Sequence, residues 1–200
     1  MTSTEDLYQK ALEYLLGDIE EPESWHRHSI AVSEIAKPVA QALLDNGVGV
    51  DVDYVVIGAL LHDIGRRVDC GTLHGWEGYR MLQGTPFRRY AGPCVTHWLK
   101  GRTHETITEE GDLPPEIVSE ILSAGNFQEL PLEDKIICIA DAMAKSNEIV
   151  TIEDRYTDAR KRYGNNDWIV SNEKLTLVFK DQIDRLLEAD LYSLFPGLSD

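Results

Sequence analysis

The sequence has few of the residues that build disulfide or thiolate–zinc scaffolds. Its 200 residues include only three cysteines, Cys70, Cys94 and Cys138. Their odd number and the lack of any C-x-x-C spacing argue against a disulfide framework and against a thiolate zinc site. Cys138 lies in the apolar segment from Ile136 to Ala140 and is expected in the core. The fold must therefore be stabilised by an ordinary hydrophobic core, for which a chain of this length suffices.

Long apolar segments and an excess of positive charge are also missing. No apolar run approaches the roughly 20 residues of a membrane-spanning helix, and the N-terminus lacks the basic and apolar parts of a signal peptide. The formal net charge of −16 argues against general binding to nucleic-acid backbones and to anionic membranes. We therefore expect a cytoplasmic protein without a nucleic-acid or membrane partner. The charge leaves room for a small anionic substrate if basic side chains gather at its site, and it leaves the oligomeric state open.

Apolar residues recur at helical spacing along most of the chain, and no segment shows the alternation typical of strands. The predicted class is all-α, with a single domain over residues 1–200, its motif-bearing core at about 25–145 and C-terminal helices at 151–189. We predict a capped helix start at Ser3 to Asp6 and further helices at about 22–43, 55–61, 73–82, 86–99, 114–122, 132–143, 151–163 and 168–187. The polar, acidic segment 101–113 is predicted to be a loop or an irregular lid.

The segment from Tyr54 to Arg67 carries the first chemical signal. Its apolar part is hydrophobic on almost every side, which indicates a buried helix. The helix ends in His62 and Asp63, and Gly65 is expected to stop it, because glycine enters the left-handed region without a Cβ penalty. Carboxylates are rarely fully buried unless they are paired or bound to a metal. Taken alone, the two residues would be explained best as a satisfied polar pair at a helix terminus.

The same feature recurs at His28, His74, His97 and Asp141, each inside or beside an apolar predicted helix. A single histidine of this kind is usually a core residue with a hydrogen bond to the backbone. Four histidines and two aspartates on five predicted helices indicate a metal site instead. Nitrogen and oxygen ligands suit iron, manganese, cobalt or magnesium-type ions, and six ligands suffice for two ions with open positions.

Four of these residues resemble the H…HD…D signature of the HD-domain superfamily of metal-dependent phosphohydrolases. The resemblance covers roughly Trp25 to Lys145 and lies in three segments, Arg27-His28-Ser29, Leu60-Leu61-His62-Asp63-Ile64-Gly65 and Asp134 to Asp141. His74 and His97 resemble the extra histidines of its binuclear branches, which include diadenosine tetraphosphate hydrolases, HD-GYP phosphodiesterases and di-iron HD oxygenases. The Gly-Tyr-Pro element of the HD-GYP proteins is absent.

The resemblance implies an HD-domain helical bundle with a metal site between core helices. It implies one divalent ion held by His28, His62, Asp63 and Asp141, and a second held by Asp63, His74 and His97. Asp63 would bridge the two ions and take part in catalysis. Physical chemistry agrees, because a water between two cations loses its proton near neutral pH and can attack phosphorus.

Basic and aromatic residues near these ligands are candidates for binding the substrate. Arg66 follows Asp63 by three residues and could hold a phosphate oxygen through its planar guanidinium, which makes it a catalytic candidate as well. Further substrate-binding candidates are Lys100, Arg102 and Lys145, although a solvated surface charge is the commoner role. The tryptophans beside the ligands, Trp25, Trp76 and Trp98, could wall a pocket, although packing is their commoner role.

Three functions remain open at this stage. The first is a phosphohydrolase that acts on a phosphate ester or anhydride of a small metabolite, with a nucleotide as the leading candidate. The second is a di-iron HD-domain oxygenase, because the same six ligands can hold an iron pair. The third is a non-catalytic nucleotide sensor, against which the complete ligand set and Arg66 argue. The sequence names neither the substrate nor the native metal.

Overall fold

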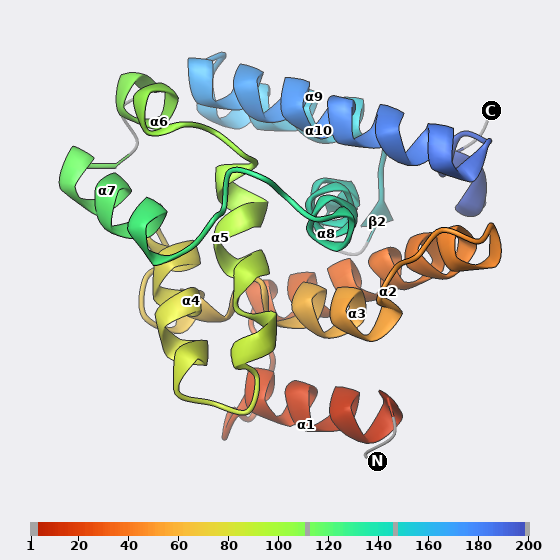
Figure 1. Cartoon of the computed structure of the whole chain (residues 1–200), viewed down its shortest axis with the longest axis horizontal. Helices are drawn as coiled ribbons and strands as arrows, with labels where there is room; N and C mark the ends of the chain where they lie inside the picture. The colour runs from red at the N-terminus through yellow and green to blue at the C-terminus, as the bar shows by residue number, and fades with distance from the viewer. Residues whose placement is uncertain (1–3, 111–112, 146–147, 199–200) are drawn as a thin grey trace.

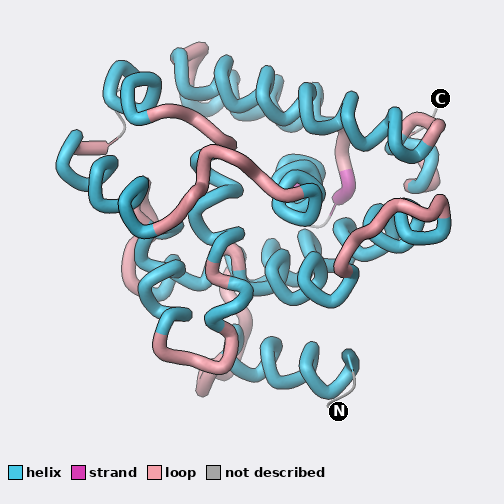
Figure 2. Tube along the Cα trace, viewed as in Figure 1, coloured by secondary structure: helices cyan, strands magenta, loops and turns pink. Residues whose placement is uncertain are grey.

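Helices make up almost all of the regular structure, as Figures 1 and 2 show. The computed structural model describes residues 4–110, 113–145 and 148–198. The α-helices are α1 (Thr4–Leu16), α2 (Ser24–Asp45), α3 (Val52–Leu61), α4 (His74–Gln83), α5 (Gly92–Leu99), α6 (His104–Glu110), α7 (Pro115–Ala124), α8 (Leu132–Met143), α9 (Ile152–Tyr163) and α10 (Asp167–Leu187). Short 3-10 helices are η1 (Ile64–Arg67), η2 (Arg88–Tyr90) and η3 (Leu191–Leu194). The predicted all-α class is confirmed.

One small β element was not predicted. Strands β1 (Ala144–Lys145) and β2 (Glu148–Ile149) form a short antiparallel pair directly after α8, drawn in magenta in Figure 2. Two residues per strand are too few to show an alternating pattern in the sequence. Within the described residues, no helix combines the length and the apolar character needed to cross a membrane.

Helix α8 is the centre of the fold. It contacts α2, α3, α5, α9 and α10, and Figure 1 shows it end-on between the α2–α3 pair and the α9–α10 pair. The side chains from Ile136 to Ala140 are at most 1% exposed, Cys138 among them. A helix that is apolar on all sides is stable only when it is surrounded. The prediction of a core helix at residues 132–143 is therefore confirmed.

Three hydrophobic clusters fill the space between the helices. The first joins α2, α3, α8, α9 and α10, and the second joins α1, the other side of α3 and the segment from Leu82 to Cys94. The third joins α4 and α5 to α6 and α7, which form the left edge of the molecule in Figure 1. Helices α3, α5 and α8 are therefore held in place by packing on more than one side, so they form a rigid frame for side chains at their ends.

The start of α5 differs from the prediction. The helix begins at Gly92 and not at Pro86, and Pro93 occupies its first turn. Proline favours the first turn of a helix at either position. Near Pro86 the chain forms a turn instead, in which the Thr85 hydroxyl accepts a hydrogen bond from the Phe87 amide before η2 begins.

The predicted loop at 101–113 is partly wrong, because α6 occupies residues 104–110. The Thr103 hydroxyl accepts a hydrogen bond from the Thr106 amide and caps this helix. Ile107 is 1% exposed and packs in the third cluster. One buried side chain in a short acidic helix is too weak a periodic signal for the sequence to show. At the other end of the chain, α1 starts at Thr4, and the predicted cap at Ser3 lies outside the described residues.

Candidate metal centre

Helix α3 delivers His62 and Asp63 to the interior, but Gly65 acts differently from the prediction. The helix ends at Leu61, before η1, and Gly65 is not among the glycines with a left-handed backbone. A Cβ on Gly65 would lie 1.9 Å from the backbone oxygen of His74 and 2.4 Å from the amide nitrogen of Gly78. Glycine is therefore needed because η1 packs directly against the first turns of α4, and this contact brings His74 close to Asp63.

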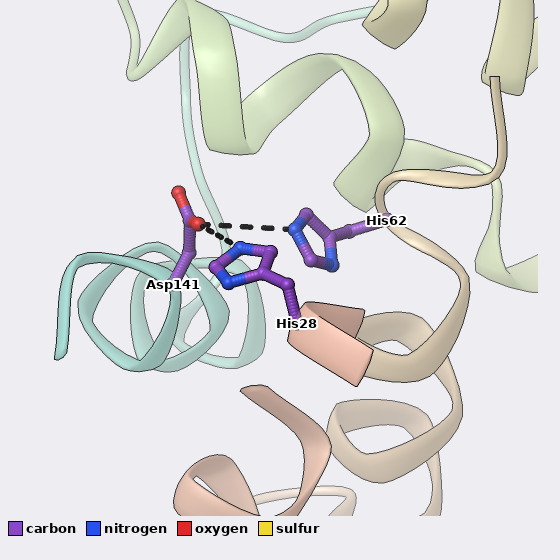
Figure 3. A group of neighbouring side chains, drawn as sticks. All are labelled: His28, His62 and Asp141. Carbon is purple, nitrogen blue, oxygen red and sulfur yellow. Dashed lines mark hydrogen bonds and ion pairs between the residues drawn. The ribbon is translucent and has the colours of Figure 1, made fainter. Parts of the chain in front are cut away.

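The first group of candidate ligands comes from three separate helices. His28 projects from α2, His62 follows α3 and Asp141 lies in the last turn of α8. His28 Nε2 is 2.9 Å from Asp141 Oδ1, and His62 Nε2 is 3.9 Å from the same oxygen. Figure 3 shows the two rings and the carboxylate pointing toward one another. Ligand atoms gathered in this way can hold one metal ion.

A second group surrounds Asp63 and shares His62 with the first. Asp63 Oδ1 lies 3.2 Å from His74 Nε2 and 3.6 Å from His97 Nε2, while Oδ2 lies 3.8 Å from His62 Nε2. The Nε2 atoms of His74 and His97 are 3.2 Å apart. The six side chains that the sequence singled out as metal ligands therefore lie in two adjoining groups, which share His62.

Backbone carbonyls fix the orientation of three of the rings. His62 Nδ1 is 2.6 Å from the Ala59 oxygen, His74 Nδ1 is 2.5 Å from the Gly71 oxygen and His97 Nδ1 is 2.9 Å from the Pro93 oxygen. A carbonyl oxygen only accepts, so Nδ1 carries the hydrogen and Nε2 of a neutral ring presents its lone pair to the centre. This arrangement is typical of histidines that bind metals through Nε2.

The resulting centre contains hydrogen-bond acceptors without matching donors. His62 Nε2 and Asp63 Oδ1 are buried and accept no hydrogen bond among the described residues. Buried polar atoms are almost always satisfied, and several acceptors that face one another repel unless a cation lies between them. The nitrogen and oxygen donors therefore fit a divalent metal.

The electrostatics favour the protonation states that metal binding needs. Burial lowers the pKa of His97 to about 3 and also lowers the pKa of His62, so both rings are neutral at physiological pH. Burial alone would raise the pKa of Asp63, but the neighbouring imidazoles and Arg66 outweigh it and hold this pKa well below its usual range. The pKa of Asp141 is lowered in the same way, chiefly by His28 against the effect of burial. Neutral imidazole and ionised carboxylate are the forms that bind cations.

A cavity of about 750 Å³ opens onto this centre, and two of the predicted substrate-binding residues line it. Arg66 Nε donates a hydrogen bond to Asp63 Oδ2 at 2.6 Å, and the Arg66 side chain is 30% exposed. Lys100 is only 3% exposed. Its Nζ donates to the hydroxyls of Tyr156, at 3.1 Å, and Thr176, at 2.7 Å. Both cations are thus held by the protein at the edge of the cavity.

The structure does not bring Arg102 or Lys145 to the cavity. The guanidinium of Arg102 is buried 3.8 Å above the ring of Trp168 and donates to the Trp98 carbonyl. Lys145 lies 3.7 Å from Asp158 in an ion pair. The observed contacts of these two side chains are therefore structural ones.

Sequence reasoning missed most of the remaining cavity wall. Trp25 and Trp98 do line it, whereas Trp76 stacks on Tyr79 instead. The C-terminal helices add cavity-lining residues that were not singled out, among them Arg155, Tyr156, Ala159, Arg162, Tyr163 and Trp168. Their helical spacing was visible in the sequence, but only the packing of α9 on α8 and α10 shows which side of the helix meets the cavity.

Comparisons with known proteins concern the same segment of the chain. Residues 25–146 match the family model of the HD domain. An uncharacterized protein of Methanocaldococcus jannaschii is 34% identical over 162 residues, which cover 80% of this chain and 88% of that protein. No solved structure matches the chain. All six candidate ligands lie inside the segment that matches the HD domain.

Proposed function

The chain belongs to the HD-domain family of metal-dependent phosphohydrolases, and from this premise we propose that it hydrolyses a phosphate ester or anhydride of a small metabolite, with a nucleotide as the first candidate. The observation that carries the proposal is the cluster of histidine nitrogens and carboxylate oxygens around Asp63, in which His62 Nε2 and Asp63 Oδ1 are buried without a hydrogen-bond partner among the described residues. A set of this kind suits a divalent cation, and it borders a cavity large enough for a metabolite.

The proposed centre holds two divalent ions of iron, manganese, cobalt or magnesium. His28, His62, Asp63 and Asp141 would hold one, and Asp63, His74 and His97 would hold the other. Support for the second position comes from His74 and His97, whose Nε2 atoms converge at 3.2 Å. When bound, the ions supply the positive charge that acidifies a water and neutralises phosphoryl oxygens.

The protein's own groups position the ligands and the substrate. The Arg66 guanidinium orients the Asp63 carboxylate through Oδ2, so that Oδ1 faces His74 and His97. The exposed part of Arg66 is available at the cavity for an oxygen of the substrate phosphate. Lys100 adds a second fixed positive charge to the cavity wall. Phosphoryl transfer depends mainly on such positioning and charge neutralisation.

A substrate panel tests the proposal. The protein is reconstituted separately with Mn²⁺, Fe²⁺, Co²⁺ and Mg²⁺, its metal content is measured, and release of phosphate or nucleotide is followed for phosphomonoesters, phosphodiesters and nucleotide anhydrides. Asp63→Ala, purified in parallel, gives the background from contaminating phosphatases. Metal-dependent turnover by the wild-type protein alone supports the proposal, and a fully loaded protein that hydrolyses nothing in the panel overturns it.

The same preparations separate the two other candidate functions. Oxygen uptake by the iron-loaded protein without phosphate release would favour the di-iron oxygenase. Tight nucleotide binding without turnover would favour the sensor. A cytoplasmic location and the absence of nucleic-acid and membrane partners stay predictions that rest on composition and charge.

A further inference from the structure

Part of the cavity wall comes from α9 and α10, which lie beyond the residues that match the HD domain. Figure 1 shows these helices packed along the side of α8 that faces away from α1. The metal ligands belong to the matched segment, whereas this part of the wall does not. The choice of substrate can therefore depend on residues of α9 and α10 that take no part in metal binding.

Helix α9 presents two arginines to the cavity with a small residue between them. Arg155, Ala159 and Arg162 all line the cavity and follow one another at intervals of four and three residues. This spacing places them on one face of the helix. The short side chain of Ala159 leaves room between the two arginine side chains, so a ligand group can approach the helix there.

The cavity-lining cations differ in their partners. Arg66 is bonded to the Asp63 carboxylate, and Lys100 is bonded to two buried hydroxyls. Arg162 forms an ion pair with Asp158 at 2.7 Å. In the part of the chain that the structure describes, the Arg155 side chain forms neither a hydrogen bond nor an ion pair, and only its backbone amide donates, to the Thr151 carbonyl.

The lack of a partner at Arg155 is unexpected in this chain. The sequence holds 35 acidic residues against 19 lysines and arginines, so a carboxylate partner would be easy to provide. Arg155 is half-buried at the cavity, where a partly dehydrated guanidinium without a partner costs free energy. A planar guanidinium binds phosphate or carboxylate through two parallel hydrogen bonds. An anionic ligand group in the cavity would supply the missing partner.

We propose that Arg155 binds a second anionic group of the substrate, separate from the phosphoryl group at the metal centre. The substrate class would then be metabolites with two anionic groups, either two phosphates, as in a nucleoside bisphosphate, or a phosphate and a carboxylate. The volume of about 750 Å³ accommodates a molecule of this size. This inference rests on the proposed function for the place of the reacting phosphate.

Equilibrium binding of matched probes tests the inference on the Mn²⁺-loaded protein, at low temperature to slow any turnover. One pair is adenosine 3′,5′-bisphosphate and adenosine 5′-monophosphate, and the other is 3-phosphoglycerate and glycerol 3-phosphate. In one of the pairs, the member with two anionic groups should bind about 10- to 100-fold more tightly than its partner, as expected for one charge-assisted contact. The pair that shows the preference identifies the second group as phosphate or carboxylate.

Two charge-matched variants locate the contact. Arg155→Gln should reduce the preference to within about 3-fold, because the bidentate contact is lost. Lys161→Gln removes one positive charge from an exposed position of the same helix and should leave the preference unchanged. Thermal unfolding checks that both variants are folded. A third variant, Arg155→Lys, retains the positive charge but not the planar guanidinium, and it should lose most of the preference.

The outcomes separate this inference from the proposed function. Equal affinity within both pairs, or a preference that survives in Arg155→Gln, would overturn the role of Arg155 even if the protein proves to be a phosphohydrolase. A preference that depends on Arg155, in a protein that hydrolyses nothing in the substrate panel, would support the anion subsite and reject the hydrolase.

Discussion

The Nε–H of Arg66 donates a hydrogen bond of 2.6 Å to Oδ2 of Asp63, while Oδ1 of the same carboxylate faces His74 and His97 at 3.2 and 3.6 Å. Arg66 therefore orients the carboxylate around which the second group of candidate ligands is arranged. The sequence suggested only a contact with substrate for this residue. Groups that orient metal ligands affect metal affinity as well as catalysis, so the two roles lead to different measurements.

Arg66→Ala should weaken metal binding by about 10- to 100-fold, as is typical when a group that orients a ligand is removed. Calorimetric titration of the metal-free protein with Mn²⁺ measures the effect. Arg80→Ala is a suitable control, because Arg80 is 58% exposed and forms its ion pair with Glu77 at the surface. If Arg66 contacted substrate alone, metal affinity would match that of the wild-type protein while kcat/KM fell.

Asp63→Ala should remove both activity and most of the bound metal, because Asp63 faces His62 on one side and His74 and His97 on the other. Elemental analysis of the purified protein, together with the substrate panel, measures both. His104→Ala is the control, since His104 is exposed and its Nε2 is 3.0 Å from the Ser119 hydroxyl. Normal metal content in the Asp63 variant would contradict the bridging position.

The cluster of candidate ligands could be predicted because several of its members break a local rule. His62 and Asp63 end an apolar helix, and Asp141 lies in another, so each conflicts with the pattern around it in the sequence. Arg155 breaks no such rule, because an arginine on an amphipathic helix is ordinary. Its position at the cavity depends on how α9 packs, which is information from distant parts of the chain.

Tertiary contacts also explain why two predictions made from the sequence differ from the structure. Arg102 follows His97 closely and was a reasonable candidate for binding substrate, but Trp168, far along the chain, stacks against it. Gly65 fits the rule for a helix stop, yet the structure needs it for close contact with α4. Local rules predict that glycine is special at this position, but they do not reveal which neighbour makes it so.

Gly65→Ala should destabilise the protein by about 2–4 kcal/mol, because the new methyl group overlaps the backbone of α4 and forces α4 and η1 apart. Thermal or urea unfolding measures the loss. Gly84→Ala is the matched control, because no atom lies within 4 Å of its Cβ position, and the change should stay within about 0.5 kcal/mol. Equal stability of the two variants would contradict the close packing of η1 on α4.

Asp134 introduces a pH dependence away from the metal ligands. It is 2% exposed, and the hydroxyls of Tyr54 and Thr96 donate to its two oxygens at 3.1 and 2.7 Å. Burial raises the pKa of Asp134 to about 6, and these hydrogen bonds only partly oppose the rise. The unfolded chain releases this proton near pH 3.8, the ordinary pKa of an aspartate side chain. Between these two pKa values the folded protein binds more protons than the unfolded chain does, so the stability contributed by this group falls as pH increases.

Asp134→Asn should therefore gain stability relative to the wild-type protein as the pH rises from about 4 to 7, by up to about 3 kcal/mol for a pKa difference of about two units. Urea unfolding of both proteins at a series of pH values measures the difference, in which contributions from the metal ligands cancel because both proteins contain them. Tyr54→Phe keeps the Asp134 carboxyl group but removes a hydrogen bond that lowers its pKa, so the loss of folding stability should extend to higher pH in this variant. A stability difference that stays constant across this range would mean that Asp134 is already ionised in the folded protein, and that its two hydroxyl partners outweigh its burial.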